Sequence, residues 1–126
     1  MKTVFLTFFV SMLATYPVAA AEDVFMTGEE LKALFAADKT INLGGPEEGY
    51  TGTLMIKADG SGVGTAKTSG GKVIVLEGTW YVKKDNFCRK WKDLDKGKEV
   101  CEAWKKIGDN RVEVQVKKKK VGVNWW

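Results

Sequence analysis

Histidine is absent from all 126 residues of the chain. Its absence excludes histidine general acid–base catalysis, Ser–His and Cys–His nucleophile pairs, and the usual zinc sites. Cysteine is scarce too, with Cys88 and Cys101 the only two, and they are too far apart for a C-x-x-C redox pair. The composition is otherwise that of a globular protein, with 44% hydrophobic and 29% charged residues.

The first 21 residues have the features of a secretory signal peptide. Lys2 provides a positive charge, residues 4–14 form an apolar run, and residues 19–21 form an A-x-A cleavage site. A membrane anchor is the alternative, but the run falls short of about 20 apolar residues and no basic stop-transfer segment follows. We expect cleavage after the second or third alanine, leaving residues 22–126 as one periplasmic or secreted domain with no transmembrane segment.

One short helix is predicted at the start of this domain. Residues 27–30, Thr-Gly-Glu-Glu, have the pattern of a capping box. Leu31, Leu34 and Phe35 follow with helical periodicity. We therefore expect an amphipathic helix of about three turns that ends near Asp38.

The rest of the chain reads as strands, because turn sequences recur at intervals of roughly 10 to 14 residues. Strands are expected near residues 49–58, 62–68, 72–83, 86–93, 98–106, 111–117 and 120–126, with a weaker one at 40–43. Seven or eight sequential antiparallel strands must protect their edges, and closing into a barrel is the simplest way. The predicted fold is therefore mainly β, a small up-and-down barrel with one N-terminal helix. A two-sheet sandwich is the alternative.

The two cysteines suggest one strand register. A cysteine pair in a small exported domain most often forms a disulfide. If Cys88 pairs directly with Cys101, then Phe87 lies opposite Glu102. Arg89 and Glu102 then become diagonal neighbours on a face that otherwise carries aromatic residues. The sulfur-bearing face is rich in charged residues, so we expect it to face outward and the Arg89–Glu102 pair to face inward.

Alternation along the strands places four of the five tryptophans inside the barrel. These are Trp80, Trp91, Trp104 and Trp125. In one interpretation they line a cavity for an apolar ligand, and Arg89 and Glu102 bind a charged group of that ligand. In the other they fill a small eight-stranded barrel completely, and the Arg89–Glu102 pair is structural. We expect the filled interior, which would move function to the outer surface and the loops.

Charge is distributed unevenly along the chain. Residues 22–66 contain three lysines and eight acidic residues, whereas residues 67–126 contain sixteen basic and eight acidic residues. A run of four lysines, Lys117, Lys118, Lys119 and Lys120, falls at a predicted hairpin turn. Export argues against nucleic acid as its partner and favours an anionic envelope surface, such as lipopolysaccharide or phospholipid headgroups. The alternative is a solvated loop tip that protects a strand edge.

Four short motifs span most of the mature chain: Met-Thr-Gly-Glu-Glu-Leu at 26–31, Gly-Thr-Trp at 78–80, Cys-Arg-Lys-Trp at 88–91 and Cys-Glu-Ala-Trp at 101–104. They resemble motifs of small exported bacterial proteins with lipocalin-like (calycin-like) barrels. The Gly-Thr-Trp triplet is also similar to a lipocalin signature, although in lipocalins it opens the first strand and here it lies mid-barrel. The resemblance implies a barrel in a Gram-negative periplasm and brings no catalytic residues with it.

Catalysis finds little support in the residues. Carboxylates such as Asp93 and Asp95 fall in turns, and the glycines of residues 60–64 lie in a hairpin turn, unlike a phosphate-binding loop. We expect no enzyme activity, metal or cofactor. The predicted function is a binding or envelope-accessory protein for an apolar or anionic envelope ligand. The alternative is an inhibitor that binds an exported hydrolase protein.

Overall fold

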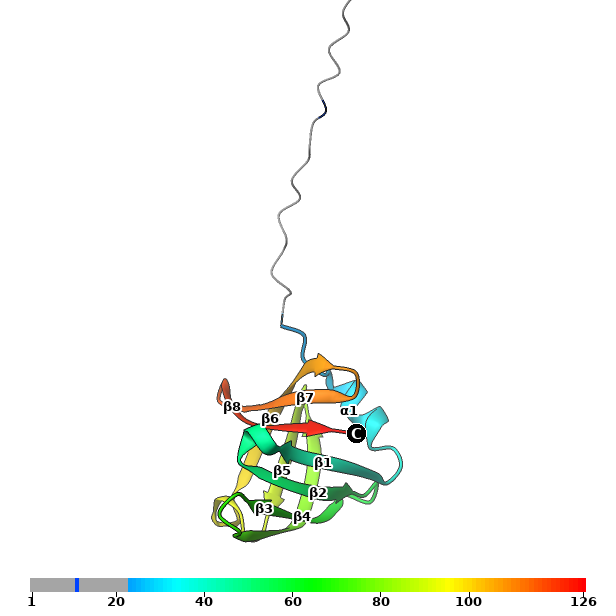
Figure 1. Cartoon of the computed structure of the whole chain (residues 1–126). Helices are drawn as coiled ribbons and strands as arrows, with labels where there is room; N and C mark the ends of the chain where they lie inside the picture. Colours follow the sequence, from blue (N-terminus) through cyan, green and yellow to red (C-terminus); the bar gives the residue numbers. More distant parts are fainter. Residues whose placement is uncertain (1–10, 12–22) are drawn as a thin grey trace, which may run out of the picture.

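The structure is a computed structural model that describes Ser11 and residues 23–126. Apart from Ser11, the predicted signal peptide lies outside the described residues. Eight antiparallel strands, paired in sequence order, close into a barrel (Figure 1). The strands are β1 (Lys39–Gly45), β2 (Tyr50–Ile56), β3 (Ser61–Thr68), β4 (Val73–Lys83), β5 (Asn86–Trp91), β6 (Glu99–Gly108), β7 (Arg111–Val116) and β8 (Lys119–Trp125).

The observed fold, a mainly β barrel with one N-terminal helix, agrees with the prediction from the sequence. Pairing of β1 with β8, at Asn42 opposite Trp125 and Leu43 opposite Asn124, closes the barrel and excludes the sandwich. The helix is α1 (Gly28–Leu34), and two short 3-10 turns follow, η1 (Pro46–Glu48) and η2 (Asp95–Gly97). Within residues 23–126, no helix is long and apolar enough to cross a membrane.

Helix α1 begins as predicted and ends early. Thr27 Oγ1 accepts a hydrogen bond from the Glu30 backbone N–H, and the Glu30 carboxylate accepts one from the Thr27 backbone N–H, so the capping box is confirmed. The helix has seven residues, about two turns rather than three. It ends at Leu34 because Phe35, the C-cap residue, is buried inside the barrel, and the chain turns there.

The helix covers one end of the barrel, which we call the closed end. Helix α1 contacts β4 and β5 and lies at the same end as the C-terminus (Figure 1). The Gly28 backbone N–H donates to the Asp85 carboxylate in the β4–β5 turn, at 2.8 Å. The Met26 backbone N–H donates to the Trp104 carbonyl, so the segment before the helix extends the sheet along β6. The opposite, open end is bordered by the β1–β2, β3–β4, β5–β6 and β7–β8 connections.

Aromatic rings fill the closed end. The ring centroid of Phe35 lies 5.2 Å from that of Trp80, 5.5 Å from that of Phe87 and 5.8 Å from that of Trp104. Trp104 also packs against Trp126, with 6.2 Å between centroids. Ring pairs at these distances add to the stability gained from burial alone. The expectation of a filled interior is therefore correct for this half of the barrel.

Trp125 is not inside the barrel, contrary to the prediction. Its side chain is exposed, and its Nε1 donates to the Gly44 carbonyl at 3.2 Å. The inner positions of β8 are instead Gly122 and Asn124. A Cβ at Gly122 would collide with the Tyr50 hydroxyl, so a larger residue there would have to displace the Tyr50 side chain. Apolar alternation pointed to the wrong face because one inner position is glycine and the next is polar.

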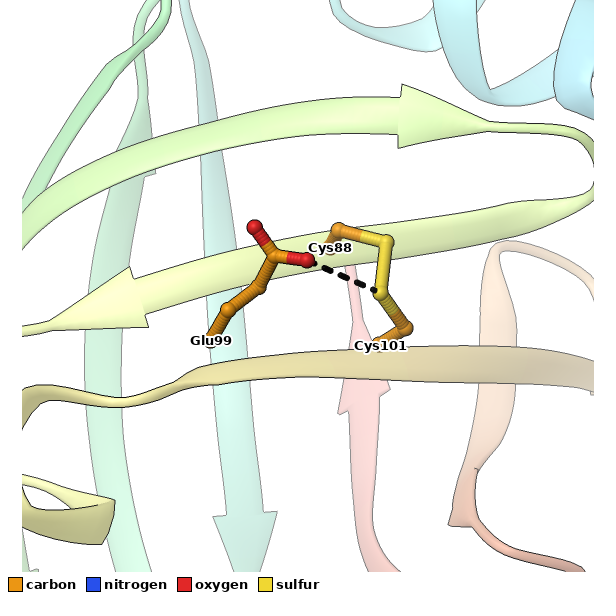
Figure 2. Close-up of side chains that lie close together, drawn as sticks. All are labelled: Cys88, Glu99 and Cys101. Atoms are coloured by element: carbon orange, nitrogen blue, oxygen red, sulfur yellow. Dashed lines mark hydrogen bonds between the residues drawn. A yellow bond between two sulfur atoms is a disulfide. The ribbon is translucent and has the colours of Figure 1, made fainter.

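Cys88 and Cys101 form the predicted disulfide, and the register inferred from it is confirmed, with Phe87 opposite Glu102. The Glu99 carboxylate lies 3.8 Å from Cys101 Sγ (Figure 2). A disulfide sulfur carries no proton, so this contact is not a hydrogen bond. Cys88, Glu99 and Cys101 lie close enough together to suggest a metal site, but the two sulfurs are bonded to each other. The group therefore offers no thiolate to a metal ion.

Removing the disulfide is expected to lower the free energy of unfolding by about 3 kcal/mol, because a closed loop of about 15 residues restricts the unfolded chain by that amount. Urea denaturation of the Cys88→Ala/Cys101→Ala double variant against wild type measures the loss. Thiol titration of the native protein should find no free sulfhydryl. Equal unfolding midpoints, or two reactive thiols in the native protein, would contradict the expectation.

Candidate ligand-binding cavity

A cavity of about 990 Å³ occupies the open half of the barrel. Its volume lies at the upper end of the range of about 300–1,000 Å³ that is typical of small-molecule sites. Its wall is largely apolar and includes Leu43, Leu54, Ile74, Leu76, Trp91 and Val114. The expectation of an interior that is filled throughout is wrong for this half.

Small inner residues keep this half hollow. Gly52 lies directly opposite Ala66, so two adjacent inner positions of β2 and β3 carry almost no side chain. Trp91 lies along the wall rather than across the cavity. A Cβ at Gly62 would lie 2.6 Å from Trp91 Cη2, and one at Gly78 would lie 3.2 Å from Trp91 Cε3. The indole therefore rests on two glycine backbones and leaves the centre open.

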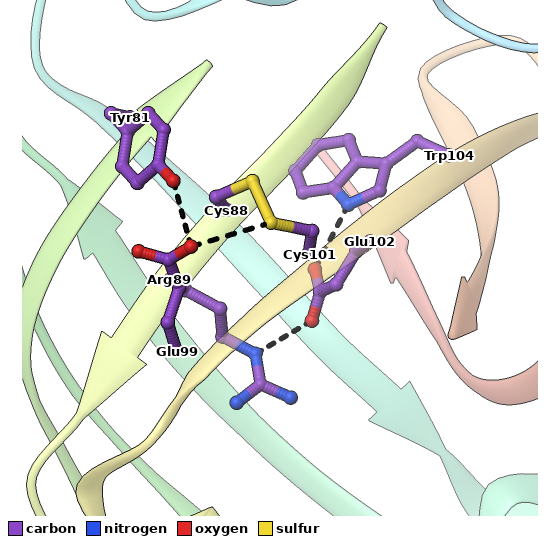
Figure 3. The surroundings of a disulfide bond; sticks show 7 residues. All are labelled: Tyr81, Cys88, Arg89, Glu99, Cys101, Glu102 and Trp104. Carbon is purple, nitrogen blue, oxygen red and sulfur yellow. Dashed lines mark hydrogen bonds and ion pairs between the residues drawn. A yellow bond between two sulfur atoms is a disulfide. The ribbon is translucent and has the colours of Figure 1, made fainter. Parts of the chain in front are cut away.

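A cluster of three charged side chains lies on the cavity wall. Arg89 Nε donates to Glu102 Oε2 at 2.7 Å, and Trp104 Nε1 donates to Glu102 Oε1 at 3.0 Å (Figure 3). Arg89 Nη1 donates to Asp95 Oδ2 at 2.8 Å. Arg89 and Glu102 are 8% and 7% exposed. Burial of the guanidinium opposes its charged form, but attraction and hydrogen bonds from Glu102 and Asp95 outweigh it and raise the pKa of Arg89.

Asp95 reaches Arg89 from outside the sheet, because it belongs to the β5–β6 connection. This connection folds back over the open end, where Leu94 packs against the core and Asp95, Lys96 and Lys98 line the cavity. The sequence analysis placed Asp95 in a turn and did not predict its contact with Arg89. Two carboxylates from different elements therefore share one buried guanidinium.

Two further polar side chains line the cavity, and neither was selected from the sequence as a site residue. The Tyr50 hydroxyl accepts a hydrogen bond from the Val123 backbone N–H at 3.2 Å, and burial raises the pKa of that hydroxyl. Because the hydroxyl is neutral, it can also donate a hydrogen bond to a ligand acceptor in the cavity. Asn124 is buried on the inner face of β8. Both residues could have been selected from the sequence, because each is a polar residue at an inner position of a strand.

Four of the six residues predicted to bind a ligand line the cavity: Arg89, Glu102, Trp91 and Trp104. The other two do not. Trp80 belongs to the closed end, where its ring stacks on Phe87 and its Nε1 donates to the Lys57 carbonyl at 2.8 Å. Trp125 lies on the outer surface.

The four-lysine run, residues 117–120, spans the β7–β8 turn and the first two residues of β8, at the rim of the open end. Lys117 and Lys118 have φ of 50° and 66°, as in a type I′ hairpin turn. Lys117 lines the mouth of the cavity, and Lys120 Nζ lies 2.9 Å from Glu48 Oε1. All four lysines are exposed, so the run adds positive charge around the cavity mouth.

No family model matches this chain, and no curated protein or solved structure is significantly similar to it. The fold and the cavity therefore carry the functional interpretation. An eight-stranded antiparallel barrel of this kind is compatible with a calycin-like architecture. Its distinguishing features are an aromatic closed end and a hollow open end with a charged wall.

Replacing Glu102 by glutamine is expected to lower the free energy of unfolding by about 3 kcal/mol, because the buried Arg89 keeps only Asp95 as a charged partner. The matched control is Glu77→Gln, on the exposed face of β4, which should change stability by less than about 0.5 kcal/mol. Urea denaturation at pH 7 measures both. Equal effects of the two substitutions would contradict a structural role for the Arg89–Glu102 pair.

Proposed function

We propose that the protein is an exported, non-enzymatic binding protein that holds one apolar ligand with an acidic group inside its barrel. The observation that carries this proposal is the apolar cavity of about 990 Å³ with the buried Arg89 on its wall. In such a wall a guanidinium forms strong charge-assisted hydrogen bonds with an acidic group. The predicted signal peptide and the disulfide support a periplasmic or secreted location, and the lipocalin-like motifs support the binding role.

The charge at the cavity mouth supports an anionic ligand. Lys96, Lys98 and Lys117 line the mouth, and all three are exposed. A positive rim raises the local concentration of anionic molecules and speeds their association. The ligand that fits both the rim and the wall is an anionic amphiphile of the cell envelope.

Protein binding is the second function that we propose, in the form of an inhibitor of an exported hydrolase. It would use the outer face of the barrel, where the exposed side chains of Met55 and Val63 lie opposite each other on β2 and β3. Exposed apolar side chains that gather on one face are typical of interaction surfaces. A stoichiometric protein captured from envelope extract by the mature chain, with no apolar probe bound in the barrel, would favour this function.

An apolar fluorescent probe with a carboxylate should bind at about one per chain and quench tryptophan emission, because Trp91 and Trp104 line the cavity. Arg89→Met should weaken binding of this probe about tenfold or more, because the variant loses a charge-assisted hydrogen bond that contributes about that much affinity. Binding of its uncharged methyl ester should change by less than about twofold.

The matched control is Lys90→Met, which removes a positive charge from the exposed face of the same strand. It should leave both affinities unchanged. Absence of binding by either probe would contradict the proposed function. Equal losses for the acid and the ester in Arg89→Met would contradict the role of Arg89 alone.

The four-lysine run is proposed to bind anionic envelope surfaces. Replacing Lys117, Lys118, Lys119 and Lys120 with serine should weaken binding to vesicles that contain anionic phospholipid, and wild-type binding should fade as salt rises. The control replaces four exposed lysines elsewhere: Lys67, Lys72, Lys90 and Lys92. Equal losses in the two quadruple variants, or no wild-type binding, would identify the run as a solvated loop tip.

A further inference from the structure

We infer that Asp95 occupies the position of the ligand's carboxylate, and that an acidic ligand binds by replacing Asp95 on Arg89. This inference rests on the proposed function, because it requires an acidic apolar ligand in the barrel. The ligand class is an apolar carboxylic acid, since the group that it replaces is itself a carboxylate and the cavity wall is largely apolar. Asp95 then sets how strongly the barrel prefers acidic over neutral ligands.

The two carboxylate partners of Arg89 differ in how firmly they are held. Glu102 is buried on β6, and its two oxygens accept hydrogen bonds from different donors, Arg89 Nε and Trp104 Nε1. The side chain of Asp95 is 44% exposed, and its ion pair is with Arg89 Nη1. A ligand that enters from the open end meets Asp95 first. Asp95 is therefore the partner that exchanges, and Glu102 is the partner that stays and orients the guanidinium.

Charge balance favours exchange over simple addition. With all three groups ionised, Arg89, Glu102 and Asp95 carry one positive and two negative charges. A ligand carboxylate added to this cluster would place a third negative charge beside one guanidinium in an apolar wall, which like-charge repulsion opposes. Replacement of Asp95 keeps the charge of the cluster unchanged and moves a half-exposed carboxylate fully into water.

The backbone around Asp95 favours its release. Asp95 and Lys96 have φ of 53° and 57°, and Gly97 has φ of 69°. Two consecutive residues other than glycine in the left-handed region are uncommon and persist where other contacts hold them. The Arg89–Asp95 ion pair is such a contact. Because Leu94 and Lys96 line the cavity on either side of Asp95, movement of this turn would widen the mouth.

The test compares two variants of the full mature chain. Asp95→Asn keeps the size of the side chain and removes the charge that competes for Arg89. Its affinity for the carboxylate probe should rise about tenfold, and its affinity for the methyl ester should change less than about twofold. The matched control, Asp93→Asn, removes the same charge from the same connection. Among the described residues, Asp93 forms no ion pair with Arg89, so its acid-to-ester affinity ratio should equal that of wild type.

A second measurement uses the wild-type protein and does not depend on the folding of a variant. The side-chain carboxyl carbon of Asp95, followed by NMR, should shift when the carboxylate probe is added and stay in place when the ester is added. Binding to wild type with an unchanged acid-to-ester ratio in Asp95→Asn, or a ratio that falls, would overturn this inference and leave the proposed function standing. No binding of either probe by wild type and Asp95→Asn alike would overturn both.

Discussion

The enclosed volume of an eight-stranded barrel is nearly fixed, and the features of this protein depend on how that volume is divided. At the closed end, the chain that follows helix α1 inserts Phe35 among three other aromatic rings. At the open end, Gly52 and Ala66 occupy neighbouring inner positions, and a cavity of about 990 Å³ results. Dense aromatic packing in one half stabilises the barrel while the other half stays hollow.

The buried arginine connects this architecture to the proposed function. A buried ion pair is weak evidence for stability, because apolar residues of similar volume often stabilise a core as well or better. Arg89 lies on a cavity wall, and its charge is balanced by one buried and one half-exposed carboxylate. An arrangement with one fixed and one exchangeable partner suits the recognition of an acid. For this reason we propose that Arg89 binds the ligand and that Glu102 orients Arg89.

Sequence reasoning predicted the barrel, the strands, the disulfide and the Arg89–Glu102 contact, because strand alternation and hairpin register are local properties. Trp125 was placed on the wrong face because the apolar pattern of β8 does not follow its inner positions. The contact of Asp95 with Arg89 depends on how a connection folds over the barrel, which no periodicity encodes. The filled interior was preferred to the cavity because a cavity's volume is what remains after every side chain is placed, and the sequence does not show that Trp91 lies along the wall.

Nuclear Overhauser effects between a bound carboxylate probe and the methyl-labelled protein test most directly whether the open half of the barrel holds the ligand. The account predicts effects from the probe chain to the methyl groups of Leu54 and Leu76, which line the cavity. It predicts none to Val63, which is exposed on the outer face of β3. Effects confined to Val63 and other outer methyl groups, at saturating probe, would contradict it.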